Sequence, residues 1–172
     1  MRIALPVCAA LLLYGCGESP HPELDLGKEN KNFLCADASV ASQPTMRQQR
    51  NLAFYNAKFT LGMQVKDQVT HFMESYLKAI GVQDDKQIAT IAYSVNQELE
   101  ALLEKAEQKA IVIEAERTMR ITACLEPTLF TYRLEETIRN VLKNERIVWA
   151  RFQEQSSQDL LHNALESFKP LP

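Results

Sequence analysis

The chain has 172 residues, of which 46% are hydrophobic and 24% are charged, and its formal net charge is −3. These values are ordinary for a globular protein of one domain, and the length allows a substantial buried core. No basic stripe points to nucleic acid as a partner, and no polybasic cluster points to an anionic lipid surface.

The N-terminus has the pattern of a secretory signal. Arg2 supplies a positive charge, residues 3–14 are mostly apolar, and the small residue Gly15 stands before Cys16. A charged start, a short apolar run and a small residue at the cut are typical of a cleaved signal peptide. The apolar run is also too short to span a bilayer, which takes roughly 20 residues. The sequence therefore predicts a signal peptide over residues 1–15.

The stretch Leu13-Tyr14-Gly15-Cys16 resembles the lipobox of bacterial lipoproteins, with an aliphatic residue, a variable residue, a small residue and then cysteine. The resemblance covers only this N-terminal segment. It implies that cleavage falls between Gly15 and Cys16, that Cys16 carries diacylglycerol, and that the new N-terminus is acylated, for example with palmitate. Each buried methylene contributes about 0.8 kcal/mol, so two or three chains anchor a protein stably.

The residue after the cysteine indicates which of the two membranes holds a lipoprotein. In Gram-negative lipoproteins an aspartate at that position favours the inner membrane, and this chain has Gly17. The resemblance therefore implies an outer-membrane anchor facing the periplasm. The alternatives are an ordinary cleaved signal with release of the protein, or an uncleaved anchor.

Residues 16–32 have the composition of a linker. They hold Pro20, Pro22 and Gly27 among charged and amide residues, without apolar periodicity. Such a stretch is expected to be a flexible tether. Residues 33–172 remain as one helical domain.

The cysteines predict a disulfide. If Cys8 leaves with the signal peptide and Cys16 carries lipid, Cys35 and Cys124 are left as an even pair in an exported protein. Such a pair usually forms a bridge. The alternatives are two buried thiols or a metal site, although neither cysteine has a histidine nearby in the sequence.

The first half of the domain predicts two helices. Residues 45–61 are expected to form the first, although Phe59, Leu61 and Met63 alternate with polar residues and leave a short strand near 59–65 as an alternative. Residues 65–80 carry apolar side chains at three- and four-residue spacings. Gly81 follows as a helix stop.

One long helix is expected over residues 85–124, because its apolar residues keep a helical period up to Ile113. A strand over 111–123 is the competing interpretation. We prefer the helix because the chain has no glycine after Gly81 to make a hairpin turn.

Pro127 ends that helix, and further helices are expected over 128–155 and 161–168. The predicted fold class is therefore all-α, an antiparallel helical bundle.

No motif in the sequence indicates catalysis. The zinc motif with two histidines one turn apart, the nucleophile elbow and the glycine-rich phosphate loop are all missing. Asp67 and His71 are spaced to share a helix face and could supply two metal ligands, but a solvated polar face is the preferred interpretation. We predict no catalytic residue, no metal site and no cofactor.

Two further features of the apolar pattern are candidates for a binding surface. Arg117 and Arg120 fall on the expected apolar stripe of the long helix, and Arg117 could meet Glu135 across the Pro127 turn. The three charges would make either a polar patch that a partner recognises or an ordinary helix-end ion pair.

The aromatic residues Phe54, Tyr55 and Phe59 are the second feature. They are interpreted as core, with a docking face as the alternative.

The first functional hypothesis is a non-enzymatic, lipid-anchored periplasmic protein that binds an unknown envelope protein. Assembly, secretion accessory and immunity or inhibitor roles all fit it. The second is a binding module for a lipid or small apolar ligand between helices, and the third is an enzyme. A filled core with one exposed apolar patch would favour a protein partner.

Overall fold

The computed structural model of the protein describes residues 34–166 and Phe168. In chain order the elements are β1 (Cys35–Val40), α1 (Met46–Ala79), α2 (Asp85–Glu98), α3 (Glu100–Leu103), β2 (Glu107–Ile113), β3 (Met119–Cys124), α4 (Pro127–Lys143), α5 (Arg146–Phe152) and α6 (Gln155–Glu166). A 3-10 turn over Ala115–Arg117 joins β2 to β3. The predicted signal peptide 1–15, Cys16 and the predicted tether 16–32 lie outside the described residues.

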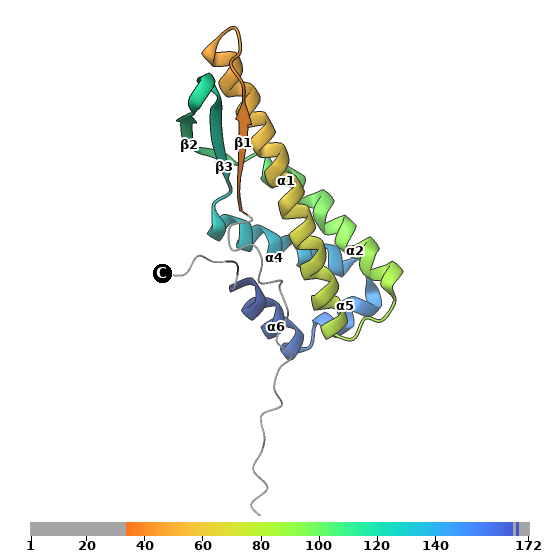
Figure 1. Ribbon diagram of the computed structural model, residues 1–172. Helices are drawn as coiled ribbons and strands as arrows, with labels where there is room; N and C mark the ends of the chain where they lie inside the picture. The colour runs from red at the N-terminus through yellow and green to blue at the C-terminus, as the bar shows by residue number, and fades with distance from the viewer. Residues whose placement is uncertain (1–33, 167, 169–172) are drawn as a thin grey trace, which may run out of the picture.

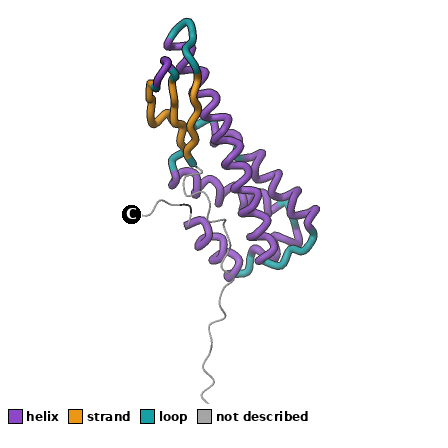
Figure 2. The backbone as a smooth tube through the Cα atoms, viewed as in Figure 1, coloured by secondary structure: helices purple, strands orange, loops and turns teal. Residues whose placement is uncertain are grey.

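Helix α1 is the long axis of the fold (Figure 1). Its 34 residues extend over about 51 Å at 1.5 Å per residue. The Thr45 side chain caps its start by accepting a hydrogen bond from the backbone N–H of Gln48 at 3.2 Å. The three strands lie along its N-terminal half, and the other helices gather around its C-terminal half (Figure 2).

The buried face of α1 explains this division. Its central apolar residues recur every four positions and are fully or almost fully buried: Ala53, Ala57, Leu61, Val65 and Val69. Toward the N-terminus, Ala53 packs with Val40, Met119 and Ile121 of the sheet. A small side chain at this contact lets the sheet lie close to the helix axis, whereas larger residues further on fill the core between helices.

The sheet has the strand order β1-β3-β2, and both pairings are antiparallel. In the central strand β3, Met119, Ile121 and Ala123 are buried, whereas Arg120 between them is exposed. This period of two is that of a strand with one face on the core. Strand β2 is an edge, and its register shifts between Gln108 and Ala110.

The predicted all-α class is wrong, because residues 107–124 form two strands instead of the end of a long helix over 85–124. Helix α2 ends at Glu98, and the chain turns into β2 after the short α3. Glu116 and Arg117 make the hairpin turn, each with a φ of 58°. That left-handed conformation favours glycine. The turn is built without one, so missing glycine was a poor reason to exclude strands.

The alternative of a short strand near 59–65 is also wrong, since those residues lie inside α1. The two helices expected over 45–61 and 65–80 are one continuous helix. Gly81 follows its end with a φ of +87°, as expected of a helix stop.

The C-terminal part of the chain divides differently from the expectation. The helix expected over 128–155 is interrupted at Asn144 and Glu145, which separate α4 from α5. The last helix, α6, begins at Gln155. Burial raises the pKa of Tyr76, whose hydroxyl donates to the backbone carbonyl of Ser157 at 3.0 Å and ties α6 to α1.

The disulfide predicted between Cys35 and Cys124 is present, with the two Cα atoms 4.1 Å apart. The two residues face each other as register partners of β1 and β3. The bridge therefore joins the start of the first strand to the end of the central strand, next to the turn into α4. It closes a loop with a sequence separation of 89 residues.

Candidate functional site

The described residues bring no metal-binding group together. No three histidine, cysteine, aspartate or glutamate side chains among them could hold a metal ion. Asp67 and His71 do lie one turn apart on α1, with Oδ1 and Nε2 separated by 3.8 Å, and both side chains are exposed. They form a solvated pair on the helix surface.

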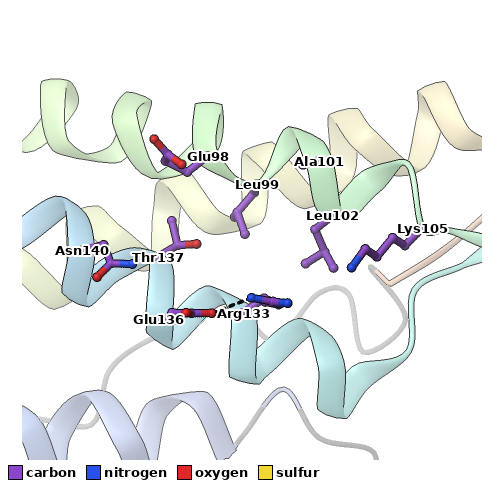
Figure 3. Close-up of a pocket in the computed structure, with 9 residues that line it drawn as sticks. All are labelled: Glu98, Leu99, Ala101, Leu102, Lys105, Arg133, Glu136, Thr137 and Asn140. Atoms are coloured by element: carbon purple, nitrogen blue, oxygen red, sulfur yellow. Dashed lines mark hydrogen bonds and ion pairs between the residues drawn. The ribbon is translucent and has the colours of Figure 1, made fainter.

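A hollow of about 350 Å³ lies between the α2–α3 segment and α4 (Figure 3). Arg133 and Glu136 form an ion pair of 2.8 Å along one side of it. The residues that line it are Glu98, Leu99, Ala101, Leu102, Lys105, Arg133, Glu136, Thr137 and Asn140. These residues include no histidine, cysteine or serine, so the hollow pairs no nucleophile with an imidazole base.

The most unusual surface is a row of large apolar side chains on α1, here called the α1 stripe. Its members and their exposed fractions are Leu52 (42%), Tyr55 (68%), Phe59 (62%) and Met63 (60%). Their spacing of three, four and four residues puts them on one helix face. That face is turned away from the sheet, and no described element covers it in the N-terminal half of α1 (Figure 1).

The α1 stripe has clear limits. Toward the C-terminus, Lys66 Nζ pairs with Glu100 Oε1 at 2.7 Å. A Cβ at Gly62 would lie 3.4 Å from Leu103 Cδ1, which shows that α3 packs against the helix there. Beside the stripe, the neighbouring helix positions hold the neutral Asn51 and Asn56. Lys58, three residues from Tyr55, pairs with Glu104 at 2.7 Å, so the lysines beside the stripe are compensated by carboxylates.

A second apolar surface lies on the other side of α1, between this helix and β2. It is a groove of about 880 Å³, here called the α1–β2 groove. Its lining residues are Met46, Arg47, Arg50, Asn51, Phe54, Glu107, Gln108, Ile111, Ile113 and Met119. Ile111 and Ile113 remain 43% and 59% exposed there.

The polar patch predicted from Arg117, Arg120 and Glu135 does not form. Arg120 pairs with the Glu114 carboxylate across the hairpin, whereas Glu135 Oε1 accepts from Arg139 Nη2 at 2.8 Å on α4. Arg117 lies in the hairpin turn. The error has the same cause as the wrong fold class, because a strand period puts Arg120 on the outer face of the sheet.

The interpretation of the three aromatic residues as core is correct only in part. Phe54 is partly buried and packs against the cluster formed by Val40, Ala53, Met119 and Ile121. Tyr55 and Phe59 are exposed and belong to the α1 stripe. The sequence carried a signal for this, because apolar residues occupy more than one face of this helix.

The helix predicted over residues 85–124 leaves no place for the α1–β2 groove, because the groove is lined in part by β2. A run of β-branched residues at 111–113 was the available signal.

Neither a protein-family model nor a curated protein matches the chain. By its fold, the described part is a mixed α/β domain built on one long helix and closed by a disulfide. Within that part, none of the helices is both long enough and apolar enough to cross a bilayer.

Proposed function

We propose that the protein is a lipid-anchored periplasmic protein of the bacterial envelope that binds a protein partner and catalyses no reaction. The observation that carries the proposal is the α1 stripe, whose four large apolar side chains are 42–68% exposed on one helix face. Single exposed apolar residues are normal on a protein surface, whereas a contiguous row of them marks an interaction site.

The shape of the α1 stripe fits an amphipathic helix of the partner. From Leu52 to Met63 the row extends over about 17 Å, or three helical turns. Its spacing is close to that of a coiled-coil seam, in which side chains of one helix insert between those of another. The sheet covers one side of α1, and a partner helix bound to the stripe would cover the opposite side.

The borders of the stripe favour protein over an anionic membrane surface. A helix that lies on anionic lipid typically carries lysine and arginine beside its apolar face. Here the adjoining Asn51 and Asn56 are neutral. The lysines beside the stripe, Lys58 and Lys66, are paired with Glu104 and Glu100.

The anchor is the second part of the proposal. Lipid on Cys16 and the segment 16–32 would hold the folded domain at the membrane and away from its surface. Envelope assembly, secretion accessory and immunity or inhibitor roles are all consistent with a small anchored domain that presents one helix face.

No specific observation favours a lipid-binding module or an enzyme. The hollow between α2–α3 and α4 has a largely polar lining. The space between the helices is filled by side chains such as Phe72, Phe130 and Phe168, with centroids of Phe72 and Phe168 only 5.4 Å apart.

The anchor is tested by Cys16→Ser, followed by membrane flotation and the mass of the mature N-terminus. The proposal expects the variant to stay unprocessed and to lack the lipid mass. A variant that is processed and recovered with membranes to the same extent as the wild-type protein would contradict it.

The stripe is tested by Tyr55→Glu and Phe59→Glu, with Ile147→Glu as the matched control, because Ile147 is 70% exposed on a different helix. A partner recovered with the wild-type protein should be lost by at least about tenfold with the stripe variants and retained with the control. Equal recovery with all three variants would contradict the assignment of the stripe.

A further inference from the structure

Strand β2 presents an open sheet edge. It is the last strand in the order β1-β3-β2, so among the described strands it pairs with β3 alone. Backbone N–H and C=O groups on the outer side of an edge strand can accept another strand. No described segment covers this side of β2 along its length (Figure 1).

The two ends of β2 differ in how well this edge is protected. The first part has the charged Glu107 and Lys109 and the register shift at Gln108, and both features discourage strand addition. The second part, residues 110–113, has no charge, no proline and no register shift. Strand addition is therefore expected at residues 110–113.

The groove beside this edge would receive side chains of an added strand. Ile111 and Ile113 point into the α1–β2 groove, together with Met46 and Phe54 of α1. Alternate side chains of an extended segment lie on the same face of a sheet. Every second residue of a segment paired with β2 would therefore enter this apolar groove, which specifies apolar residues at alternate positions.

The charged side chains of the groove favour a carboxylate on the bound segment. The side chain of Arg47 has no hydrogen-bond or ion-pair partner among the described residues. Arg50 uses its Nε to donate to Gln108 Oε1 at 2.9 Å, a neutral acceptor that leaves its charge uncompensated. Glu107, the carboxylate in the lining, is paired with Lys109 Nζ at 2.7 Å. The groove therefore has a net positive character.

We propose that the α1–β2 groove binds an extended segment of another protein by strand addition to residues 110–113 of β2, with apolar residues at alternate positions and a carboxylate against Arg47 and Arg50. The carboxylate is either an acidic side chain or the C-terminus of the segment. Backbone pairing supplies affinity and the groove supplies selectivity. This site is separate from the α1 stripe and does not depend on the function proposed for it.

A second copy of this chain fits the edge poorly. Antiparallel self-pairing along the whole of β2, centred on Ala110, would put Ile113 opposite Glu107 of the second copy and Val112 opposite its Gln108. The apolar end of each strand would then meet a polar end. This mismatch favours a different chain as the occupant.

The test uses the full chain and synthetic peptides of about ten residues, with valine at alternate positions and threonine between them. One peptide ends in aspartate and one in lysine, both with an amidated C-terminus, and a third has threonine and a free C-terminal carboxylate. Fluorescence anisotropy gives the affinities, and amide hydrogen exchange reports protection at residues 110–113. The aspartate peptide or the free-carboxylate peptide should bind at least about tenfold tighter than the lysine peptide, and which of the two does so identifies the carboxylate.

Three variants sharpen the test. Ile113→Lys should weaken binding of the preferred peptide at least about tenfold, and Arg47→Glu should abolish or reverse the charge preference. Ile147→Lys and the stripe variant Phe59→Glu should leave the peptide affinities unchanged. Both substituted groove residues are exposed, and circular dichroism verifies that the variants fold.

Failure of both carboxylate-bearing peptides to bind more tightly than the lysine peptide would overturn the proposal, as would absence of peptide binding or an affinity unaffected by Ile113→Lys. Concentration-dependent dimerisation that Ile113→Lys abolishes would show that a second copy occupies the edge instead. None of these results would test the function proposed for the α1 stripe, which is tested separately by the Tyr55 and Phe59 variants.

Discussion

Gln49 and Arg117 lie 68 residues apart in the chain and are joined by a hydrogen bond of 2.7 Å from the Gln49 side-chain amide to the Arg117 backbone carbonyl. The same amide donates to the carbonyl of Val40 at 2.9 Å. Gln49 is buried in the first turns of α1. One side chain thus holds both the end of β1 and the hairpin turn against the helix.

Gln49→Leu should destabilise the protein by roughly 1–3 kcal/mol, because two carbonyl groups lose their donor. Chemical denaturation followed by circular dichroism measures this free energy of unfolding. The control is Gln43→Ala, since Gln43 makes only a local bond of 3.3 Å to Ala41. Equal stability of the two variants would contradict the role given to Gln49.

Substitution by alanine should change the stability of the protein in opposite directions at Gly81 and Gly62. Gly81 has a φ of +87°, and a Cβ there would lie 2.7 Å from Arg151 Nη1, so Gly81→Ala should cost about 1 kcal/mol. Gly62 lies inside α1, and its added Cβ would make only a 3.4 Å contact. Gly62→Ala should therefore stabilise by up to about 1 kcal/mol. Thermal unfolding of both variants measures the two changes in stability. A change of the same sign in both variants would contradict this prediction.

The disulfide should contribute a large part of the stability. In the chain-entropy model, a loop with a sequence separation of 89 residues gives roughly 4–5 kcal/mol. The double variant Cys35→Ser and Cys124→Ser should lose about that free energy of unfolding. Reducing agent should lower the denaturation midpoint of the wild-type protein and leave that of the double variant unchanged. An unchanged wild-type midpoint would count against the bridge.

Glu126 should make stability depend on acid pH. The backbone N–H groups of Leu129 and Thr128 donate to its carboxylate at the start of α4 and hold its pKa below the ordinary value of 4.5. Because the folded pKa is lower than the unfolded one, this contribution is present above pH 4.5 and is lost as the pH falls through the folded pKa.

Denaturation midpoints of the wild-type protein and Glu126→Gln, measured from neutral pH to about pH 3, check this prediction. The difference between them should shrink as the pH falls below 4.5, with Glu154→Gln as a surface control. A difference that stays constant over this range would show that the carboxylate charge is not responsible.

Local features of the fold could be predicted from the sequence. The partnership of Cys35 with Cys124 followed from counting cysteines, and the stop at Gly81 followed from its backbone freedom. The helical character of residues 46–79 followed from apolar spacing. Each of these depends on neighbouring residues or on a simple pairing rule.

The sheet could not be predicted, because its turn depends on tertiary context. Glu116 and Arg117 adopt a left-handed conformation that their own side chains do not favour. Arg117 and Arg120 were nevertheless a warning, since two charges on an apolar helix stripe indicate that the assumed period is wrong. A strand period over 119–123 places Arg120 outward without difficulty.

The candidate binding residues could be predicted only in part from the sequence, for a related reason. The sequence shows that Tyr55 and Phe59 are apolar, but their exposure depends on which faces of α1 the sheet and helices cover. Once β1 and β3 occupy one side, no described element is left for the other. An apolar residue becomes a candidate binding residue only when the packing of the whole domain is known.

The most direct test of the central proposal is site-specific photocrosslinking in intact cells. A photoreactive amino acid would replace Tyr55 or Phe59 on the α1 stripe, and the exposed Tyr132 or Ile147 in controls. The account predicts one crosslinked protein from both stripe positions, with the crosslink mapped to an amphipathic helix of that protein, and none from the control positions. Crosslinks that are equal at all four positions, or that reach lipid alone from the stripe, would contradict it.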